Sequence, residues 1–107
     1  MNPFAFGDIV LLKFPFTDGN SFKKRPALVI NDFNDGDIIV CRITSKIYNT
    51  DNDVLLDEWE KAGLMLASVV RVHKIATLEK ELVEAHLGKI SEAEKLRIKA
   101  IVGKLTE

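Results

Sequence analysis

Four polar residues stand where two apolar runs of this chain meet polar segments, and their types suit the binding of an anion. Arg25 precedes the apolar run at residues 26–30, while Thr44, Ser45 and Lys46 end a second apolar run. A guanidinium presents paired N–H donors to two oxygens of an oxyanion, and a hydroxyl fixed beside it can orient one of them. These residues therefore indicate a site for a phosphate-like group, provided that the fold brings the two runs together.

The sequence lacks the patterns of the common metal and cofactor sites. His73, His86 and Cys41 do not form the close ligand pairs of a zinc site. The sequence also has no phosphate-binding loop, no dinucleotide-binding glycine pattern and no Gly-flanked serine. We therefore expect no metal and no cofactor.

The composition is that of an ordinary globular protein. Hydrophobic residues make up 47% of the 107 residues and charged residues 29%, which argues against disorder and against a fibrous repeat. A chain of this length has room for one core, so residues 1–107 are expected to form a single domain. The 15 Lys and Arg residues nearly balance the 16 Asp and Glu residues, so any site for a polyanion must be local.

The sequence also lacks the usual signals for export and membrane insertion. Its first residues show no basic start followed by a long apolar run, and no stretch approaches the roughly 20 apolar residues of a membrane helix. The one cysteine, Cys41, cannot form an intramolecular disulfide, and its apolar neighbours favour a small buried side chain. We expect a cytoplasmic protein that does not contact a membrane.

Short apolar runs separated by turn residues predict a mainly β protein. The run at residues 8–14 is apolar on both alternating faces, as in a strand that is covered on each side. Residues 15–25 are rich in turn-forming residues and are expected to form a loop, and Asn34, Asp35 and Gly36 are typical of a tight hairpin. Further strands are expected at residues 26–31, 37–45, 54–56, 67–78 and 83–87.

These strands favour a closed or nearly closed small barrel, which leaves no exposed sheet edge. Alternation along residues 37–45 places Arg42 and Thr44 on one face, at one end of that strand. Ser91 with Glu94 three residues later is a capping box, which predicts a helix start. The helix has an apolar stripe that would pack on the barrel, formed by Ile98, Ile101, Val102 and Leu105.

Five segments of the chain also carry a family resemblance. The motifs are "GDIVLLKFPF" followed by a polar loop, "RPALVI", "CRITSK", "AGL" and "SVVRVHKIATL". In this order and at these spacings they resemble the MazF/PemK toxin family of type II toxin-antitoxin systems. The match extends from Gly7 to the final helix. Each motif alone is weak, but the set is specific.

The resemblance implies a mainly β (α+β) fold, namely a small SH3-like, PemK-type barrel with a C-terminal amphipathic helix. It also implies a homodimer and a metal-independent endoribonuclease that cuts single-stranded mRNA at selected sequences. A cognate antitoxin protein would neutralise it by occupying the same surface. Carried over by position, the family's Arg and hydroxyl residues closest to cleavage fall on Arg25 and Thr44.

This pair suits cleavage by the neighbouring 2′-OH, which leaves a 2′,3′-cyclic phosphate. Arg25 would stabilise negative charge on the phosphoryl oxygens, and Thr44 would orient an oxygen. Arg25 is a poor proton carrier because the pKa of a guanidinium lies above about 12. The general base is therefore open, and the acid-base candidates are His73, Glu58, Glu60 and Asp18.

Further residues are candidates for contacts with RNA. The basic ones, which would follow the phosphates, are Lys23, Lys24, Lys46 and Arg42, and Ser45 and Asp18 are placed in the substrate site with them. Aromatic side chains that would stack on an unpaired base are Phe16, Phe22 and Trp59. For any one of these residues a solvated charge or a cover for the barrel end is an equally good interpretation.

Two other classes of function fit the same barrel. Gyrase-poisoning toxins of this fold are protein-binding modules that use the C-terminal helix. The combination of Arg25 and Thr44 argues against that role here, as does the chain end "GKLTE", which has no Trp. The remaining alternative is an inactive adaptor that binds RNA or protein.

Overall fold

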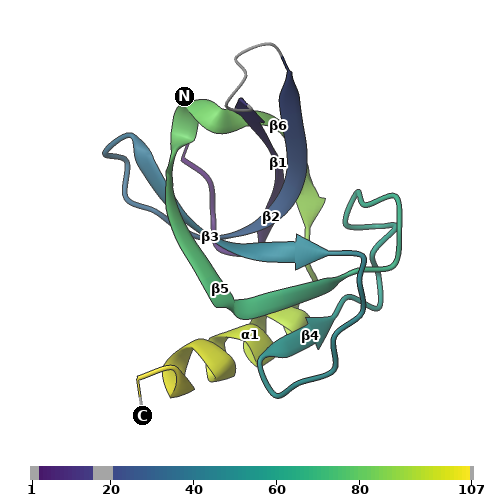
Figure 1. Ribbon diagram of the computed structural model, residues 1–107. Helices are drawn as coiled ribbons and strands as arrows, with labels where there is room; N and C mark the ends of the chain where they lie inside the picture. Colours follow the sequence, from purple (N-terminus) through teal and green to yellow (C-terminus); the bar gives the residue numbers. More distant parts are fainter. Residues whose placement is uncertain (1–2, 16–20, 107) are drawn as a thin grey trace.

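The computed structural model describes residues 3–15 and 21–106 of the chain (Figure 1). Within these ranges the elements alternate short strands with turns, and the chain ends in a helix. They are β1 (Asp8–Pro15), β2 (Phe22–Asp32), β3 (Asp37–Thr44), β4 (Asp53–Leu55), β5 (Val69–Glu79), the 3-10 helix η1 (Lys80–Leu82), β6 (Val83–Lys89) and α1 (Glu92–Lys104). Neither helix in this part of the chain is long and apolar enough to cross a membrane.

The strands form one antiparallel sheet in the order β4-β5-β3-β2-β1-β6. Figure 1 shows the sheet curled round on itself, with η1 carrying the chain from the end of β5 to the start of β6. The helix α1 lies outside this ring, against β4 and β5. The predicted fold class, a mainly β barrel with a C-terminal helix, is confirmed.

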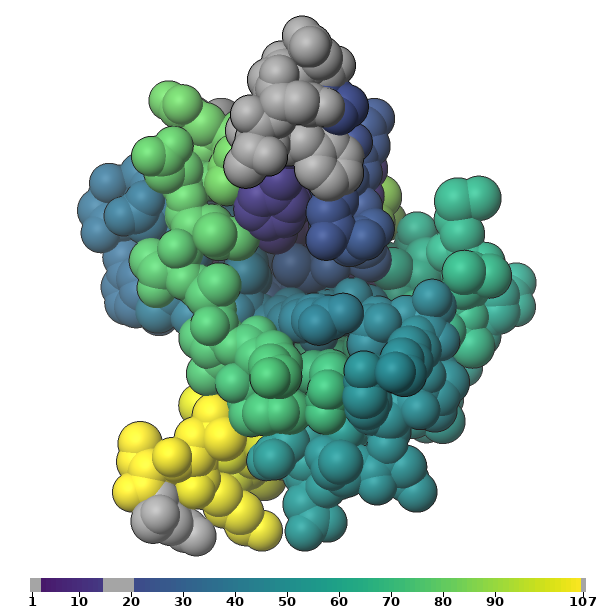
Figure 2. Space-filling model, viewed as in Figure 1, coloured from purple at the N-terminus to yellow at the C-terminus, as the bar shows by residue number. Residues whose placement is uncertain are grey.

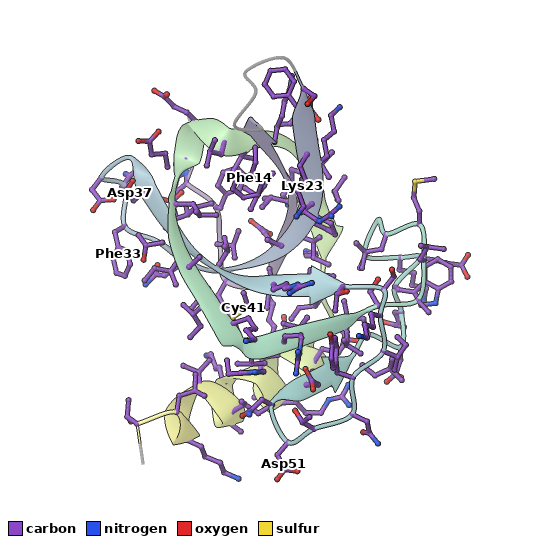
Figure 3. The ribbon with its side chains drawn as sticks, viewed as in Figure 1. Phe14, Lys23, Phe33, Asp37, Cys41 and Asp51 are labelled. Atoms are coloured by element: carbon purple, nitrogen blue, oxygen red, sulfur yellow. The ribbon has the colours of Figure 1, made fainter. Side chains whose placement is uncertain are left out.

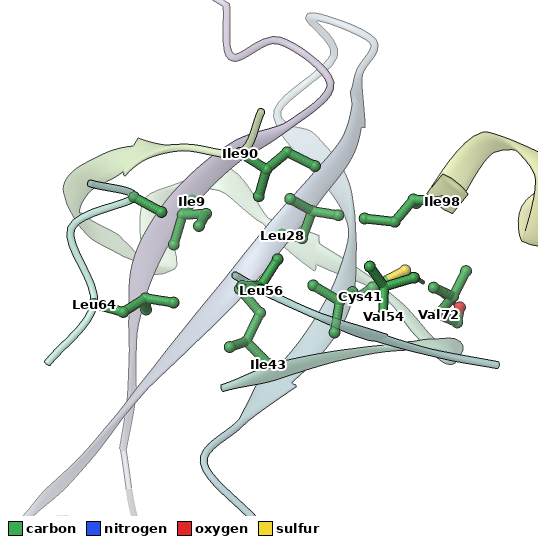
Figure 4. Packing of buried hydrophobic residues seen from close by; sticks show 12 residues of the cluster. Ile9, Leu28, Cys41, Ile43, Val54, Leu56, Leu64, Val72, Ile90 and Ile98 are labelled. Atoms are coloured by element: carbon green, nitrogen blue, oxygen red, sulfur yellow. Dashed lines mark hydrogen bonds between the residues drawn. The ribbon is translucent and has the colours of Figure 1, made fainter. Parts of the chain in front are cut away.

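The middle parts of β1, β2 and β3 are covered on both faces, and for β1 this confirms the prediction from residues 8–14. Successive side chains of a strand point to opposite faces, so these strands supply two separate apolar clusters. The uninterrupted pairing of β1 with β2 keeps neighbouring side chains on the same face. One cluster includes Ile9, Leu28 and Cys41 and reaches Ile98 of α1 (Figure 4). The other cluster fills the opposite face, with members Val10, Leu12, Ala27, Val29, Ile38 and Val40.

Cys41 is a core residue, as predicted. Its side chain is fully buried, and its Sγ donates to the carbonyl oxygen of Val72 at 3.3 Å. Burial raises the pKa of the thiol to about 11, so the group is neutral at physiological pH.

One predicted boundary is wrong. Residues 23–25 were expected at the end of a loop, but β2 already begins at Phe22, and Lys23, Lys24 and Arg25 pair with Phe14, Lys13 and Leu12 of β1. The prediction failed because three consecutive cations resemble a solvated loop. Here they extend a β1–β2 ribbon, and Phe14 and Lys23 lie together on it in Figure 3.

The predicted hairpin and capping box are both confirmed. Asn34 and Gly36 take φ values of 63° and 96°, as a tight turn between β2 and β3 requires. Ser91 accepts a hydrogen bond from the backbone N–H of Glu94, and the Glu94 carboxylate accepts one from the backbone N–H of Ser91. The same buried carboxylate also accepts a hydrogen bond from the backbone N–H of Asp57. The helix start is thereby tied to the segment after β4.

A buried ion pair between Asp32 and Lys80 links the end of β2 to η1. Asp32 accepts hydrogen bonds from Lys80 Nζ at 2.7 Å and from the backbone N–H groups of Phe4 and Asn34 at 2.8 and 2.9 Å. The bond from Lys80, reinforced by these two N–H groups, lowers the pKa of Asp32 from 3.8 to about 2. The N-terminal segment, the hairpin and η1 thus meet at one carboxylate.

The lowered pKa of Asp32 predicts that the protein loses stability in acid. Because the pKa of Asp32 is lower in the folded protein, its contribution is complete above about pH 4 and is lost as the pH falls toward 2. Asp32→Asn should therefore be less stable at pH 7 and should lose less stability than the wild type between pH 4 and pH 2. Urea unfolding at a series of pH values measures both effects. Asp51→Asn at an exposed loop position is the control, and parallel wild-type and Asp32→Asn curves would contradict the assignment.

Candidate active site

A cavity of about 560 Å³ opens where β2 begins and β3 ends. One wall comes from these strands and includes Arg25, Pro26, Arg42, Thr44 and Ser45. The apolar wall comes from residues 63–66, with Leu11 and Leu87. In Figure 2 the β2 segment (blue) and the end of β3 with its following loop (teal) share one face of the molecule.

The antiparallel register explains why Arg25 and Thr44 meet. Ala27 pairs with Arg42, which is the last recorded pair at this end of β2 and β3. If the same register is continued by two residues, Arg25 falls opposite Thr44, and both residues line the cavity. The pair predicted from sequence therefore stands at one cavity because the two strands belong to one hairpin.

Arg25 and Thr44 both retain groups that can bind an anion. Arg25 is exposed, and its one recorded side-chain bond runs from Nη1 to the Lys24 carbonyl oxygen at 3.3 Å. Thr44 is half-buried, and its Oγ1 accepts the backbone N–H of Lys46 at 3.2 Å. That bond fixes the hydroxyl oxygen and leaves its proton for a bound group.

The cavity wall carries two cations, Arg25 and Arg42, and further cations lie near it, although the whole chain carries a net charge of -1. Lys13 and Lys24 are paired with Glu84, but no ion pair with an acidic residue of the described ranges is recorded for Lys23 or Arg25. The same holds for Arg42 and Lys46 at the end of β3. Other cations without such a pair are spread over β5, β6 and α1, so β2 and β3 carry the concentrated positive charge.

Lys24, predicted to contact substrate, points elsewhere. It lies opposite Lys13 of β1, and its Nζ is 3.0 Å from Glu84 Oε2. Successive side chains of a strand alternate between faces, so Lys24 and Arg25 point to opposite sides of β2. Lys24 does not line the cavity.

Of the other predicted substrate-binding residues in the described ranges, Ser45 lines the cavity and Lys46 and Trp59 do not. Ser45 lines the cavity, whereas Lys46 is exposed beyond it, with Nζ 5.1 Å from the centre of the Tyr48 ring. Trp59 is half-buried against the larger apolar cluster and does not line the cavity. Asp18 and Phe16 lie outside the residues that the structure describes.

None of the acid-base candidates in the described residues lines the cavity. Glu58 and Glu60 are exposed in the turn after β4. His73 lies in a bulge of β5, because Cys41 and Arg42 are consecutive but pair with Ile75 and Arg71. Its Nδ1 is buried without a hydrogen-bond partner. Within the described part of the chain the cavity wall contains neither a carboxylate nor an imidazole, so the general base remains unassigned.

The apolar wall is the part of the site that sequence reasoning missed. Met65 and Leu66 are 90% and 62% exposed at the cavity, although both are apolar. Gly63, which begins this segment, has φ +87°, and a Cβ there would collide with the carbonyl group of Leu87. The "AGL" motif is the one sequence signal that marks the segment.

The described residues offer no cluster of three or more His, Cys, Asp or Glu side chains that could hold a metal ion. Metal independence stays a prediction about the reaction, and cleavage of RNA in excess EDTA tests it.

Comparison with known proteins identifies the family. A family model described as a PemK-like, MazF-like toxin of type II toxin-antitoxin systems matches residues 5–106. The chain belongs to this family. The resemblance in the motifs around Arg25 and Thr44 is thus confirmed over nearly the whole length of the toxin. A search of curated proteins finds no match.

Solved structures share the fold of this PemK/MazF-like toxin. A MazE-MazF complex from Deinococcus radiodurans superposes with a TM-score of 0.80 at 19% identity, covering 98% of this chain and 97% of the other. An endoribonuclease from Mycobacterial species gives 0.77 at 17% identity, with 99% and 93% covered. An endoribonuclease in complex with its cognate antitoxin, also from Mycobacterial species, gives 0.76 at 16% identity, with 94% and 92% covered.

Proposed function

We propose that this toxin is a metal-independent endoribonuclease that cuts single-stranded mRNA at selected sequences. The observation that carries the proposal is the shared cavity of Arg25 and Thr44, at a place where cations lack acidic partners. Membership of the toxin family and the endoribonucleases among the proteins of similar fold support it.

In the proposed reaction, the 2′-oxygen attacks the adjacent phosphorus while the bond from phosphorus to the 5′-oxygen breaks. The products are a 2′,3′-cyclic phosphate and a free 5′-hydroxyl. Arg25 binds two non-bridging oxygens, whose negative charge grows in the transition state. The Thr44 hydroxyl, held by the Lys46 N–H, donates to one of these oxygens or orients the nucleophile. The proton of the 2′-OH passes to an unassigned base, and the leaving 5′-oxygen takes up a proton from water.

The direct test is cleavage of a mixed pool of single-stranded RNA in excess EDTA. We expect the wild type to cut and Thr44→Ala to cut about 10–100-fold more slowly, whereas Thr44→Ser should retain most activity because it keeps the hydroxyl. Absence of cleavage by the wild type across varied sequences would overturn the enzyme proposal. It would favour a non-catalytic toxin or adaptor instead.

We further propose that the toxin is a homodimer whose RNA site is blocked by a cognate antitoxin. Complexes of proteins with this fold and their antitoxins support the second part. Size-exclusion chromatography with light scattering should give twice the 12.0 kDa chain mass. A monomer at micromolar concentration would contradict the dimer.

A further inference from the structure

Two arginines stand opposite each other beside the candidate active site, and only one of them is neutralised. Arg42 of β3 pairs in register with Arg71 of β5. Arg71 Nε donates to Asp53 Oδ1 at 2.9 Å, and the side chains of Arg71 and Asp53 are only 12% and 1% exposed. Arg42 is exposed, and no hydrogen bond or ion pair of its side chain is recorded among the described residues. Because Asp53 neutralises Arg71, Arg42 is the guanidinium of this pair that is left for a bound anion.

Asp53 cannot serve both arginines. Burial alone would raise the pKa of Asp53, but hydrogen bonds from Thr50 and Arg71 outweigh it and hold the pKa below its usual value. Its Oδ2 accepts both the hydroxyl and the backbone N–H of Thr50, while Oδ1 accepts Arg71. The carboxylate therefore serves Arg71, and Arg42 has no acidic partner among the described residues.

An aromatic ring covers Arg71 on the same side of the sheet. The Arg71 guanidinium lies 3.6 Å from the centre of the half-buried Tyr48 ring, close enough for direct stacking. The stack orients Tyr48 on the loop that follows β3. Lys46 Nζ lies 5.1 Å from the centre of the same ring, and its exposed, flexible side chain can move aside for a base. Of the aromatic residues predicted to stack on a base, Trp59 packs against the core and Phe22 lies beneath Lys13 on the β1–β2 ribbon.

The strand register places Arg42 next to the pair formed by Thr44 and Arg25. Thr44 follows Arg42 by two residues on the same face of β3, which corresponds to about 6.5 Å along a strand. In the continued β2–β3 register Arg25 lies across from Thr44, on β2, and Arg25 and Arg42 both line the cavity. Arg42 therefore lies two residues along β3 from Thr44, close to the place where Arg25 and Thr44 would hold the scissile phosphate.

We propose that Arg42 and Tyr48 form a second nucleotide subsite, in which Arg42 binds the phosphate next to the scissile one and Tyr48 stacks on the attached base. The inference rests on the proposed function for the nature of the ligand. It adds a specific place for the neighbouring nucleotide and a residue, Tyr48, that the sequence motifs do not indicate. Base stacking on an aromatic ring contributes about 1–3 kcal/mol and tolerates any base.

The test measures binding without cleavage. The probe is a fluorescent single-stranded RNA with 2′-O-methyl groups throughout, which has no nucleophile, and anisotropy gives Kd over a series of salt concentrations. Arg42→Gln should weaken binding at least about fivefold and lower the slope of log Kd against log salt by about 0.7, the value for one phosphate contact. Tyr48→Leu should weaken binding about 5–100-fold and leave the slope unchanged.

Conservative variants and a distant arginine serve as controls. Arg42→Lys should keep the salt slope, and Tyr48→Phe should bind like the wild type. Arg97→Gln, on the exposed surface of α1 near Asp57, should match the wild type in both respects. Thermal melting of each variant separates a loss of contact from a loss of fold.

The outcomes separate this inference from the proposed function. If the wild type cleaves RNA but Arg42→Gln and Tyr48→Leu, both folded, bind the probe like the wild type, the subsite is wrong and the enzyme proposal stands. If both variants weaken binding but the wild type never cleaves unmodified RNA, the subsite stands and the proposed reaction fails. If the folded wild type does not bind the probe, the subsite is overturned.

Discussion

Arg25→Ala should lower the rate of RNA cleavage about 10²–10³-fold while leaving the fold intact. The loss is large because the guanidinium faces charge that develops in the transition state, and removal of one such donor typically has an effect of this size. The fold should survive because Arg25 is exposed and its one recorded side-chain bond is a long one to its neighbour's carbonyl. Single-turnover cleavage of an RNA oligonucleotide, with thermal melting of the same samples, measures both.

Two further variants define what Arg25 does. Arg25→Lys keeps a point charge but loses the paired donors, so we expect an intermediate rate, about tenfold below the wild type. Arg97→Ala removes an exposed arginine on α1 and should cut like the wild type. Wild-type rates for Arg25→Ala would show that the cavity is not the active site.

Gly63→Ala should lower the free energy of unfolding by about 3 kcal/mol. Two causes combine at this position. The backbone has φ +87°, which a residue with a Cβ rarely adopts, and the added carbon would meet the backbone carbonyl of Leu87, which cannot rotate away. Urea denaturation measures the change. Because Gly63 begins the apolar wall of the cavity, residual folded protein should also cleave RNA more slowly.

The matched control is another glycine with the same substitution. Gly103 lies in α1, and a Cβ there would meet nothing within 4 Å. Gly103→Ala should therefore stabilise the protein by about 0.5–1 kcal/mol, since alanine favours the helix. Equal effects of the two substitutions would contradict the close approach between residue 63 and β6.

The fold could be predicted where the pattern is local. Alternation along residues 37–45, the turn at Asn34 and Gly36, and the capping box at Ser91 each depend on residues within a few positions of one another. The start of β2 could not be predicted in this way. Its cations pair with β1 on an exposed ribbon, where no apolar alternation marks a strand.

The same distinction holds for the site. Arg25 and Thr44 belong to one hairpin, so a correct strand prediction already brings them together. The apolar wall at Met65 and Leu66 depends on the contact between Gly63 and Leu87, which are far apart in sequence. The orientation of Tyr48 depends on its stacking with Arg71, and the bulge in β5 sets the position of Arg71. Long-range contacts of this kind leave no periodic signal in the chain.

The most direct test of the central claim is the chemistry of the cut ends. A single-stranded RNA that the wild type cuts in EDTA should yield a 2′,3′-cyclic phosphate on one fragment and a 5′-hydroxyl on the other, as read by mass spectrometry. The same RNA with a 2′-deoxy nucleotide immediately before the cut should not be cleaved at that bond. A 3′-hydroxyl with a 5′-phosphate, or cleavage of the 2′-deoxy substrate, would contradict attack by the 2′-OH and the roles assigned to Arg25 and Thr44.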